Sequence, residues 1–229
     1  MLKAKKPWKR FSNANSMAPL LQTRILAILD AGICPDLRHL VSTANKLSRS
    51  GIRFFQLRAK DWDDSRLISA VMKLKSAAAG CVITVNDRCD IAASTGVQGV
   101  HLGSDDISVE AARIILGRGG IVGASAGNPR ELRAALAERP DYISFGPAYS
   151  TSTKRDAGRA LGVAGFLRLS RLVPQGLPIL AVGGITPDNV GVLMDAGADA
   201  VAVASWWWKR GSPERAAREM IEAVRSARK

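Results

Sequence analysis

The feature that most constrains the fold of this 229-residue chain is a regular alternation of apolar runs with amphipathic stretches. Eight apolar runs recur at roughly 25-residue spacing, and each is followed by a stretch with helical periodicity. Runs this continuously apolar are typical of strands buried on both faces, and alternation with helices implies parallel strands. The pattern predicts an α/β fold, a single (β/α)8 TIM barrel. An open doubly wound sheet is the alternative, but no Gly-x-Gly-x-x-Gly follows the first run.

The order of the expected elements follows directly from these runs. The predicted strands are residues 24–29, 52–58, 81–86, 99–102, 120–125, 142–145, 178–182 and 200–204. The predicted helices lie near residues 36–49, 65–79, 90–94, 108–116, 129–137, 163–172, 187–196 and 213–227.

The positive charge of the chain is concentrated at its two ends. The formal net charge is +13, of which residues 1–16 contribute +5 and residues 209–229 contribute +4. Because the excess positive charge lies at the two ends, the rest of the chain does not form a uniformly basic surface. We therefore do not expect nucleic acid to be a partner. We expect residues 1–16 to be a basic, disordered extension, with Met17 as an alternative natural start, and residues 17–229 to form the catalytic barrel.

Composition narrows the setting of the protein. The chain is 47% hydrophobic and 23% charged, as in ordinary globular domains, and no apolar run approaches the ~20 residues needed to cross a bilayer. Three cysteines are an odd number and lack the spacing of metal ligands. The sequence thus predicts a reduced, cytoplasmic protein without a membrane partner, and it leaves a homo-oligomer open.

A loop rich in hydroxyl groups follows the sixth predicted strand. Thr151, Ser152 and Thr153 can donate hydrogen bonds, and Lys154 adds a compact positive charge. This chemistry suits a phosphate or pyrophosphate, although a solvated Ser/Thr loop has the same composition. The other strand ends favour a site, because strand ends of a barrel converge on one mouth and nearly all of them here are polar, charged or glycine.

Three carboxylates follow neighbouring strands at this mouth. Asp87, Asp105 and Asp106 would repel one another unless a cation lay among them, and oxygen ligands suit Mg²⁺. The alternative is that Asp105 or Asp106 caps the next helix.

Cations and glycines complete the set of strand-end residues. Arg58, Lys60 and Lys154 could neutralise a pyrophosphate leaving group together with Mg²⁺. Gly183-Gly184 follows the seventh strand, where barrels commonly bind a phosphate, and a tight turn with positive φ would be compatible with that role. His101, by contrast, lies among apolar residues of the fourth strand and is expected to be a packed core histidine.

Six ordered motifs resemble those of the thiamine phosphate synthase family. They are Gln-Leu-Arg-Ala-Lys (56–60), Val-Asn-Asp (85–87), Gly-Val-His-Leu-Gly-Ser-Asp-Asp (99–106), Gly-Ala-Ser-Ala (123–126), Phe-Gly-Pro-Ala-Tyr-Ser-Thr-Ser-Thr-Lys (145–154) and Val-Gly-Gly-Ile-Thr (182–186). The resemblance covers about residues 24–228.

The resemblance implies a condensation between two small-molecule substrates. A pyrimidine diphosphate (4-amino-2-methyl-5-hydroxymethylpyrimidine diphosphate) loses pyrophosphate, and the nitrogen of a thiazole phosphate captures the resulting cation to give thiamine phosphate. By position, Asp87 and Asp106 would be Mg²⁺ ligands. The residues implied to hold the pyrophosphate are Arg58, Lys60, Asn86 and Lys154. Those implied to face the pyrimidine are Gln56 and Ser125, and those implied to bind the thiazole phosphate are Thr151, Thr153, Gly184 and Ser205. Of all these, Arg58, Lys60, Lys154 and Ser125 would be catalytic.

Departures from the family pattern define the alternatives. Ala59 stands where the family usually has Glu, and Gly127 stands where a histidine is common. The related thiazole tautomerase uses that histidine, so Gly127 favours the synthase over the tautomerase. Another phosphate-handling barrel enzyme, such as an epimerase, and a non-catalytic binding protein on the same fold are further alternatives. The unusual Trp206–Trp208 could cover the barrel rim, line an oligomer contact or narrow the thiazole pocket, and would mark an interface if exposed.

Overall fold

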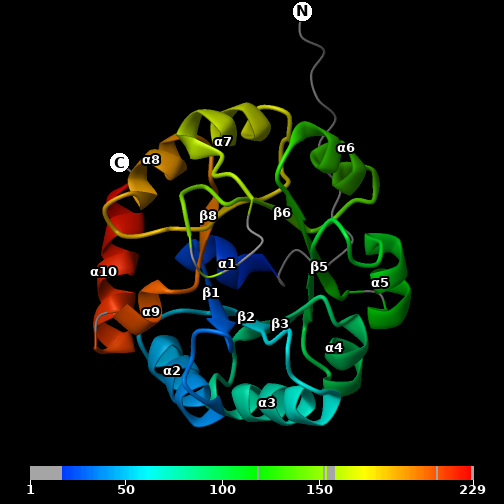
Figure 1. The fold of residues 1–229 in the computed structure, drawn as a ribbon, viewed down its shortest axis with the longest axis vertical. Coiled ribbons are helices and arrows are strands. Elements are labelled where there is room, and N and C mark those ends of the chain that lie inside the picture. The colour runs from blue at the N-terminus through cyan, green and yellow to red at the C-terminus, as the bar shows by residue number, and fades with distance from the viewer. Residues whose placement is uncertain (1–16, 118, 152, 154–157, 210, 228–229) are drawn as a thin grey trace, which may run out of the picture.

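The computed structural model describes residues 17–117, 119–151, 153, 158–209 and 211–227, and its eight parallel strands form a closed barrel. Each strand pairs with the next in sequence, and β1 pairs with β8 to close the ring, as Figure 1 shows. The strands are β1 (Ile25–Asp30), β2 (Phe54–Arg58), β3 (Val82–Asn86), β4 (Gly99–Leu102), β5 (Ile121–Ala126), β6 (Tyr142–Phe145), β7 (Ile179–Val182) and β8 (Ala200–Val203). The predicted TIM barrel is confirmed, and the open doubly wound sheet is wrong.

Helices surround the barrel and bury one face each against it (Figure 1). They are α2 (Leu37–Arg49), α3 (Asp64–Ala77), α4 (Cys89–Thr95), α5 (Val109–Leu116), α6 (Pro129–Ala137), α7 (Gly162–Ser170), α8 (Val190–Asp195) and α10 (Pro213–Ser226). Several begin at a side chain that accepts a hydrogen bond from a free backbone N–H of the first turn, which stabilises the helix start. Asp36, Asp63 and Ser212 do this for α2, α3 and α10.

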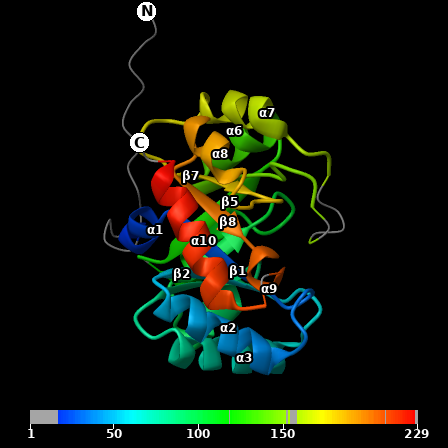
Figure 2. The same cartoon turned by 90° about the vertical axis from the view of Figure 1, so that its left-hand side faces the viewer.

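The barrel interior forms a hydrophobic core separate from the shell between strands and helices. Alternate strand residues point inward, among them Leu26, Phe54 and Leu180. A short helix that the sequence pattern did not predict, α1 (Ala18–Thr23), packs against the amino-terminal end of this core. Its Leu20 and the preceding Met17 are fully buried, and Figure 2 shows α1 at one end of the barrel. Met17 and α1 therefore plug the bottom of the barrel.

The tryptophan run lies in a short helix, α9 (Trp206–Lys209), between β8 and α10. Trp206 and Trp207 are buried in the outer core, and both indole N–H groups bond to backbone carbonyls. Trp206 Nε1 donates to the carbonyl of Ala216 at 3.1 Å and Trp207 Nε1 to that of Val203 at 2.7 Å. Trp206 and Trp207 therefore do not form an exposed aromatic patch, and they pack between β8 and α10.

Within the described residues, the helices are too short or too polar to span a membrane. The predicted disordered extension, residues 1–16, lies outside the described residues.

The plug gives a first testable expectation. Leu20→Ala should lower the free energy of unfolding by about 2–5 kcal/mol, because the truncated side chain leaves a cavity in a closed core. Gln22→Ala, in the exposed part of the same helix, should change it by less than about 0.5 kcal/mol. Urea unfolding followed by tryptophan fluorescence measures both, and equal effects would show that Leu20 does not stabilise the barrel.

Candidate active site

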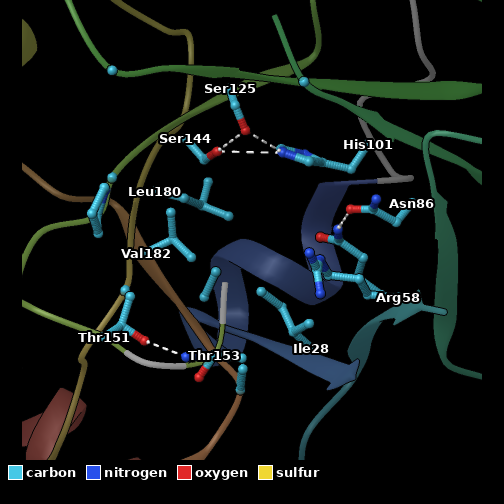
Figure 3. Close-up of a pocket in the computed structure, with 18 of the residues that line it drawn as sticks. Ile28, Arg58, Asn86, His101, Ser125, Ser144, Thr151, Thr153, Leu180 and Val182 are labelled. Atoms are coloured by element: carbon cyan, nitrogen blue, oxygen red, sulfur yellow. Dashed lines mark hydrogen bonds between the residues drawn. The ribbon is translucent and has the colours of Figure 1, made fainter. Parts of the chain in front are cut away.

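A cavity of about 550 Å³ opens at the carboxyl ends of the barrel strands. Residues from all eight strands or the loops after them line it, and Figure 3 shows their side chains converging from around the barrel. It brings together the predicted site residues Gln56, Arg58, Lys60, Asn86, Asp87, Asp106, Ser125, Thr151, Thr153, Gly184 and Ser205. Lys154, the remaining predicted residue, lies outside the described residues.

Arg58 is held by a buried aspartate at the end of the neighbouring strand. Its Nη1 donates to Asp30 Oδ2 at 2.7 Å, and Asp30 is only 1% exposed. The other carboxylate oxygen of Asp30 accepts from the backbone N–H of Gly32 at 2.8 Å. Because charge-assisted bonds of this kind have defined geometry, the guanidinium is oriented before any ligand arrives.

Two of the predicted carboxylates meet at the rim of the cavity. Asp87 and Asp106 lie close enough to interact, and Asp87 also pairs with Lys60, whose Nζ lies 3.5 Å from Oδ2. Burial, and then the neighbouring Asp106, raises the pKa of Asp87 to about 6. Asp87 has a left-handed φ of 64°, a conformation uncommon for a residue with a side chain. The two carboxylates therefore lie together although Lys60 does not fully neutralise their negative charge.

The predicted alternative role of Asp105 or Asp106 as a helix cap is wrong. Ser108 caps α5, since its side chain accepts from the N–H of Ala111. The Asp106 carboxylate instead accepts from the N–H of Gly103 at 2.6 Å, inside the loop that follows β4. This bond turns Asp106 back toward the cavity.

Carboxylates outnumber cations among the described residues that line the cavity. The cationic side chains are Arg58, Lys60 and Arg159, and the carboxylates are Asp30, Asp87, Asp105, Asp106 and Glu131. Asp30 and Asp87 already pair with Arg58 and Lys60. An anionic ligand would therefore need further positive charge in this cavity.

The floor of the cavity is a network of neutral polar side chains. Ser125 Oγ lies 2.8 Å from His101 Nε2 and 3.0 Å from Ser144 Oγ, as drawn in Figure 3. His101 Nδ1 lies 2.9 Å from the Tyr142 hydroxyl. Burial lowers the pKa of His101 to about 4, so the imidazole is neutral near pH 7. His101 is buried, as predicted, but it also lines the cavity.

The amide pair beside this floor joins two strands. Gln56 Nε2 donates to Asn86 Oδ1 at 2.7 Å, which connects the ends of β2 and β3. The remaining polar atoms of both amides are then available to a ligand.

The opposite wall combines hydroxyl groups with a glycine turn. Thr151 Oγ1 accepts from the N–H of Thr153 at 3.2 Å, and Ser205 lines the cavity after β8. Gly183 and Gly184 have φ values of 96° and 66°, which confirms the tight turn. A Cβ on Gly184 would lie 2.8 Å from the carbonyl oxygen of Ser150, so only glycine fits there.

Several residues that line the cavity were not predicted from the sequence, among them Asp30, Tyr142 and Ser144. Asp30 was missed because the first strand was expected to end at Leu29, one residue too early. Tyr142 and Ser144 were read only as members of an apolar strand. Their alternate positions in β6, both inward-facing, were a signal that could have found them.

The shifted pKa of His101 predicts a pH dependence of stability. Its pKa is about 4 in the folded protein against an ordinary 6.5, so between these values the unfolded chain binds a proton that the folded chain does not. His101 therefore lowers the free energy of unfolding as the pH falls from 6.5 towards 4, whereas the raised pKa of Asp87 acts in the opposite direction in the same range. In His101→Gln this contribution is absent, so the free energy of unfolding of the variant should fall less than that of the wild type as the pH is lowered. Urea unfolding across this range tests the expectation, and parallel curves for His101→Gln and wild type would contradict it.

The chain is similar to known proteins in sequence and in fold. The sequence model of the family described as thiamine monophosphate synthase matches residues 25–206. A thiamine-phosphate synthase of Laribacter hongkongensis is 32% identical over 206 residues, 89% of this chain and 96% of that protein. One of Xanthobacter autotrophicus is 38% identical over 83% of this chain and 90% of that protein.

A solved structure resembles the whole barrel. Thiamine phosphate pyrophosphorylase from Pyrococcus furiosus superposes with a TM-score of 0.79 at 25% identity, covering 91% of this chain and 98% of that chain. The matched residues 25–206 include every strand of the barrel and all the predicted site residues. The chain therefore belongs to the thiamine monophosphate synthase family.

Proposed function

We propose that this chain is a thiamine-phosphate synthase, a transferase that joins the pyrimidine diphosphate to the thiazole phosphate and releases pyrophosphate. The observation that carries the proposal is that one cavity holds two separate sets of anion-binding features. Arg58, Lys60 and Asn86 lie beside the carboxylate pair, while Thr151, Thr153 and the Gly183–Gly184 turn lie on the opposite wall. A condensation of two phosphorylated substrates requires this division.

The charge of the cavity supports a bound Mg²⁺. The carboxylate oxygens of Asp87 and Asp106 are ligands of the type that Mg²⁺ prefers. In the described part of the chain there is no group of three or more His, Cys, Asp or Glu side chains arranged to hold a metal ion. Mg²⁺ commonly uses one or two carboxylates and takes its other ligands from water and substrate phosphates, so a pair suffices.

The chemistry proposed for the site is departure of a leaving group followed by capture. The C–O bond to pyrophosphate breaks with its electron pair, and the lone pair of the thiazole nitrogen then forms the new C–N bond. Arg58, oriented by Asp30, and Lys60 would hold the pyrophosphate and stabilise its developing charge. When bound, Mg²⁺ would neutralise further negative charge on the leaving group. We assign Lys154 to the same group of cations from its sequence motif.

The floor of the cavity suits the cation formed in this reaction. Ser125, Gln56 and the neutral His101 present polar groups without a positive charge. A cationic floor would raise the energy of a pyrimidine cation, whereas this one does not repel it. Ser205, Thr151, Thr153 and Gly184 would bind the phosphate of the thiazole partner.

The alternative function is that of a thiazole tautomerase, and the structure around Gly127 bears on it. Gly127 lines the cavity, and its N–H donates to Glu131 Oε2 at 2.6 Å. The position thus offers no side chain for the acid–base step that a histidine there would perform. This favours the synthase. A cytoplasmic location and the oligomeric state stay predictions of the sequence.

The direct test of the function is pyrophosphate release by the full chain. Release should require both substrates together and should stop when EDTA removes divalent metal. Conversion of the thiazole alone, without pyrophosphate release, would instead support the tautomerase.

Loss of one proposed metal ligand should abolish most activity. Asp106→Asn should lower kcat/KM by about 100-fold or more, because it removes a charged ligand at the leaving group. Glu110→Gln, the same charge change at an exposed site on α5, is the matched control and should stay within about twofold. Steady-state kinetics across a range of Mg²⁺ concentrations measure both variants, and near-normal turnover of Asp106→Asn would refute the assignment.

A further inference from the structure

Asn189 directly precedes α8 but does not cap that helix. An asparagine at this position usually accepts a hydrogen bond from an N–H of the first helical turn, and the Asn189 side chain makes no such bond. It reaches back instead to the turn after β7. There its Nδ2 donates to the carbonyl of Gly184 at 2.9 Å, and its Oδ1 accepts from the N–H of Thr186 at 2.9 Å. The side chain therefore orders the turn rather than the helix.

The two partners determine which way the Asn189 amide faces. A backbone carbonyl can only accept and a backbone N–H can only donate, so the amide nitrogen faces Gly184 and the amide oxygen faces Thr186. The backbone of Asn189 is held as well. Its N–H donates to the carbonyl of Thr186 at 3.2 Å, and its carbonyl accepts from the Tyr149 hydroxyl at 3.3 Å. The half-buried Asn189 is thus anchored through both its side chain and its backbone.

Three successive carbonyls at this point of the chain, those of residues 182–184, accept a hydrogen bond from another segment. The first two bond to the N–H groups of Ala148 and Tyr149, at 2.7 Å and 3.1 Å, and the third bonds to Asn189. In a planar trans peptide unit, the carbonyl oxygen and the N–H of the next residue point in opposite directions. The N–H groups of residues 183–185 are therefore turned away from these partners.

These three N–H groups are left for a ligand. Gly183, Gly184 and Ile185 all line the cavity. Among the residues that the structure describes, none provides an acceptor within hydrogen-bonding distance of their N–H groups. Successive N–H groups of this kind, in a turn with positive φ at Gly183 and Gly184, form a concavity that binds anions.

The two glycines explain why the third peptide needs a side chain to hold it. They let the loop after β6 lie directly on the turn, since a Cβ on Gly183 would lie 2.7 Å from Pro147 Cβ and one on Gly184 2.8 Å from Tyr149 Cβ. Backbone bonds from that loop reach only the first two carbonyls. Because glycine permits a wide range of backbone angles, the peptide between Gly184 and Ile185 would rotate freely without a further bond.

We propose that Asn189 is a positioning residue, which holds the carbonyl of Gly184 and thereby aims the N–H of Ile185 at a phosphate monoester bound in the turn. Asn189 is not among the described residues that line the cavity, so it acts through the peptide that it holds. The inference rests on the proposed function only in identifying the monoester as the thiazole phosphate.

Loss of the Asn189 amide should weaken phosphate binding in two ways. The N–H of Ile185 is no longer aimed at the ligand, and rotation of the peptide brings the partial negative charge of the Gly184 carbonyl towards the phosphate. A hydrogen bond to a charged group that is lost in this way corresponds to about 10- to 100-fold in affinity. The part of the ligand that carries no phosphate should be unaffected.

Asn189→Ser tests this selectivity by calorimetry on the full chain. Serine is also favourable before a helix, but its single hydroxyl cannot bridge Gly184 and Thr186. The Kd of the thiazole phosphate should rise about 10- to 100-fold, while that of the thiazole alcohol, which lacks the phosphate, should stay within about twofold. Asp188→Ser, at the exposed neighbouring position, is the matched control and should leave both values within about twofold of the wild type.

The amide of Ile185 provides a second measurement on the wild type, which does not depend on a variant of Asn189. Labelling with ¹⁵N-isoleucine gives its ¹H–¹⁵N signal, and Ile185→Val assigns it. A hydrogen bond to a phosphate deshields an amide hydrogen, so this signal should move downfield with thiazole phosphate and not with the alcohol. A signal that does not move while the phosphate binds would overturn the proposal.

The outcomes separate this inference from the proposed function. Equal affinity for thiazole phosphate in the wild type and in folded Asn189→Ser would refute the role of Asn189. Equal losses for the phosphate and the alcohol would refute it too, because a general disturbance of the cavity would then explain both. A wild type that does not bind thiazole phosphate would overturn the inference. A loss confined to the phosphate, in a protein that releases no pyrophosphate, would refute only the proposed function.

Discussion

The closure of eight parallel strands into a ring is the constraint on which the rest of the structure depends. Closure places every strand end at one mouth, so residues far apart in sequence, such as Arg58 and Ser205, line one cavity. It also forces alternate side chains into a narrow interior, where each must pack or hydrogen-bond. The lower interior is apolar and sealed by Leu20, while the upper interior is polar and faces the cavity.

Charge in the cavity is arranged in two tiers. The deeper tier is the Asp30–Arg58 pair, in which the buried Asp30 carboxylate fixes the direction of the guanidinium through a 2.7 Å bond. The outer tier is the Lys60–Asp87–Asp106 group, half-exposed and not fully compensated. The first tier is already satisfied before binding, while the second is suited to change partners when charged ligands arrive.

The sequence predicts the barrel and most of the site because both depend on local patterns. Apolar runs of strand length and polar residues at their ends are readable without knowing which strands meet. These local patterns do not show which side chains of neighbouring strands contact one another. Asp30 reaches the site only because β1 pairs with β2, where it lies opposite Arg58. Tyr142 does so only because Gly123 on β5 leaves room for its ring.

The tryptophan run shows the same limit. Three consecutive large aromatic residues resemble an interaction surface in sequence, and their burial follows only from α10 packing over them. Thr151 and Thr153 are the opposite case, since both were predicted from composition alone to lie at the site, and both line the cavity.

The plug of Met17 and Leu20 gives the cavity a single entrance. With the amino-terminal end of the barrel filled by apolar side chains, a molecule that reaches the floor must leave along the path by which it came. In the proposed function, a substrate lying against Ser125 would then be covered by the one that follows, so the first to bind would be the last to leave. The closed end of the barrel would thus impose an order on the two reactants, in addition to any order imposed by the groups that bind them.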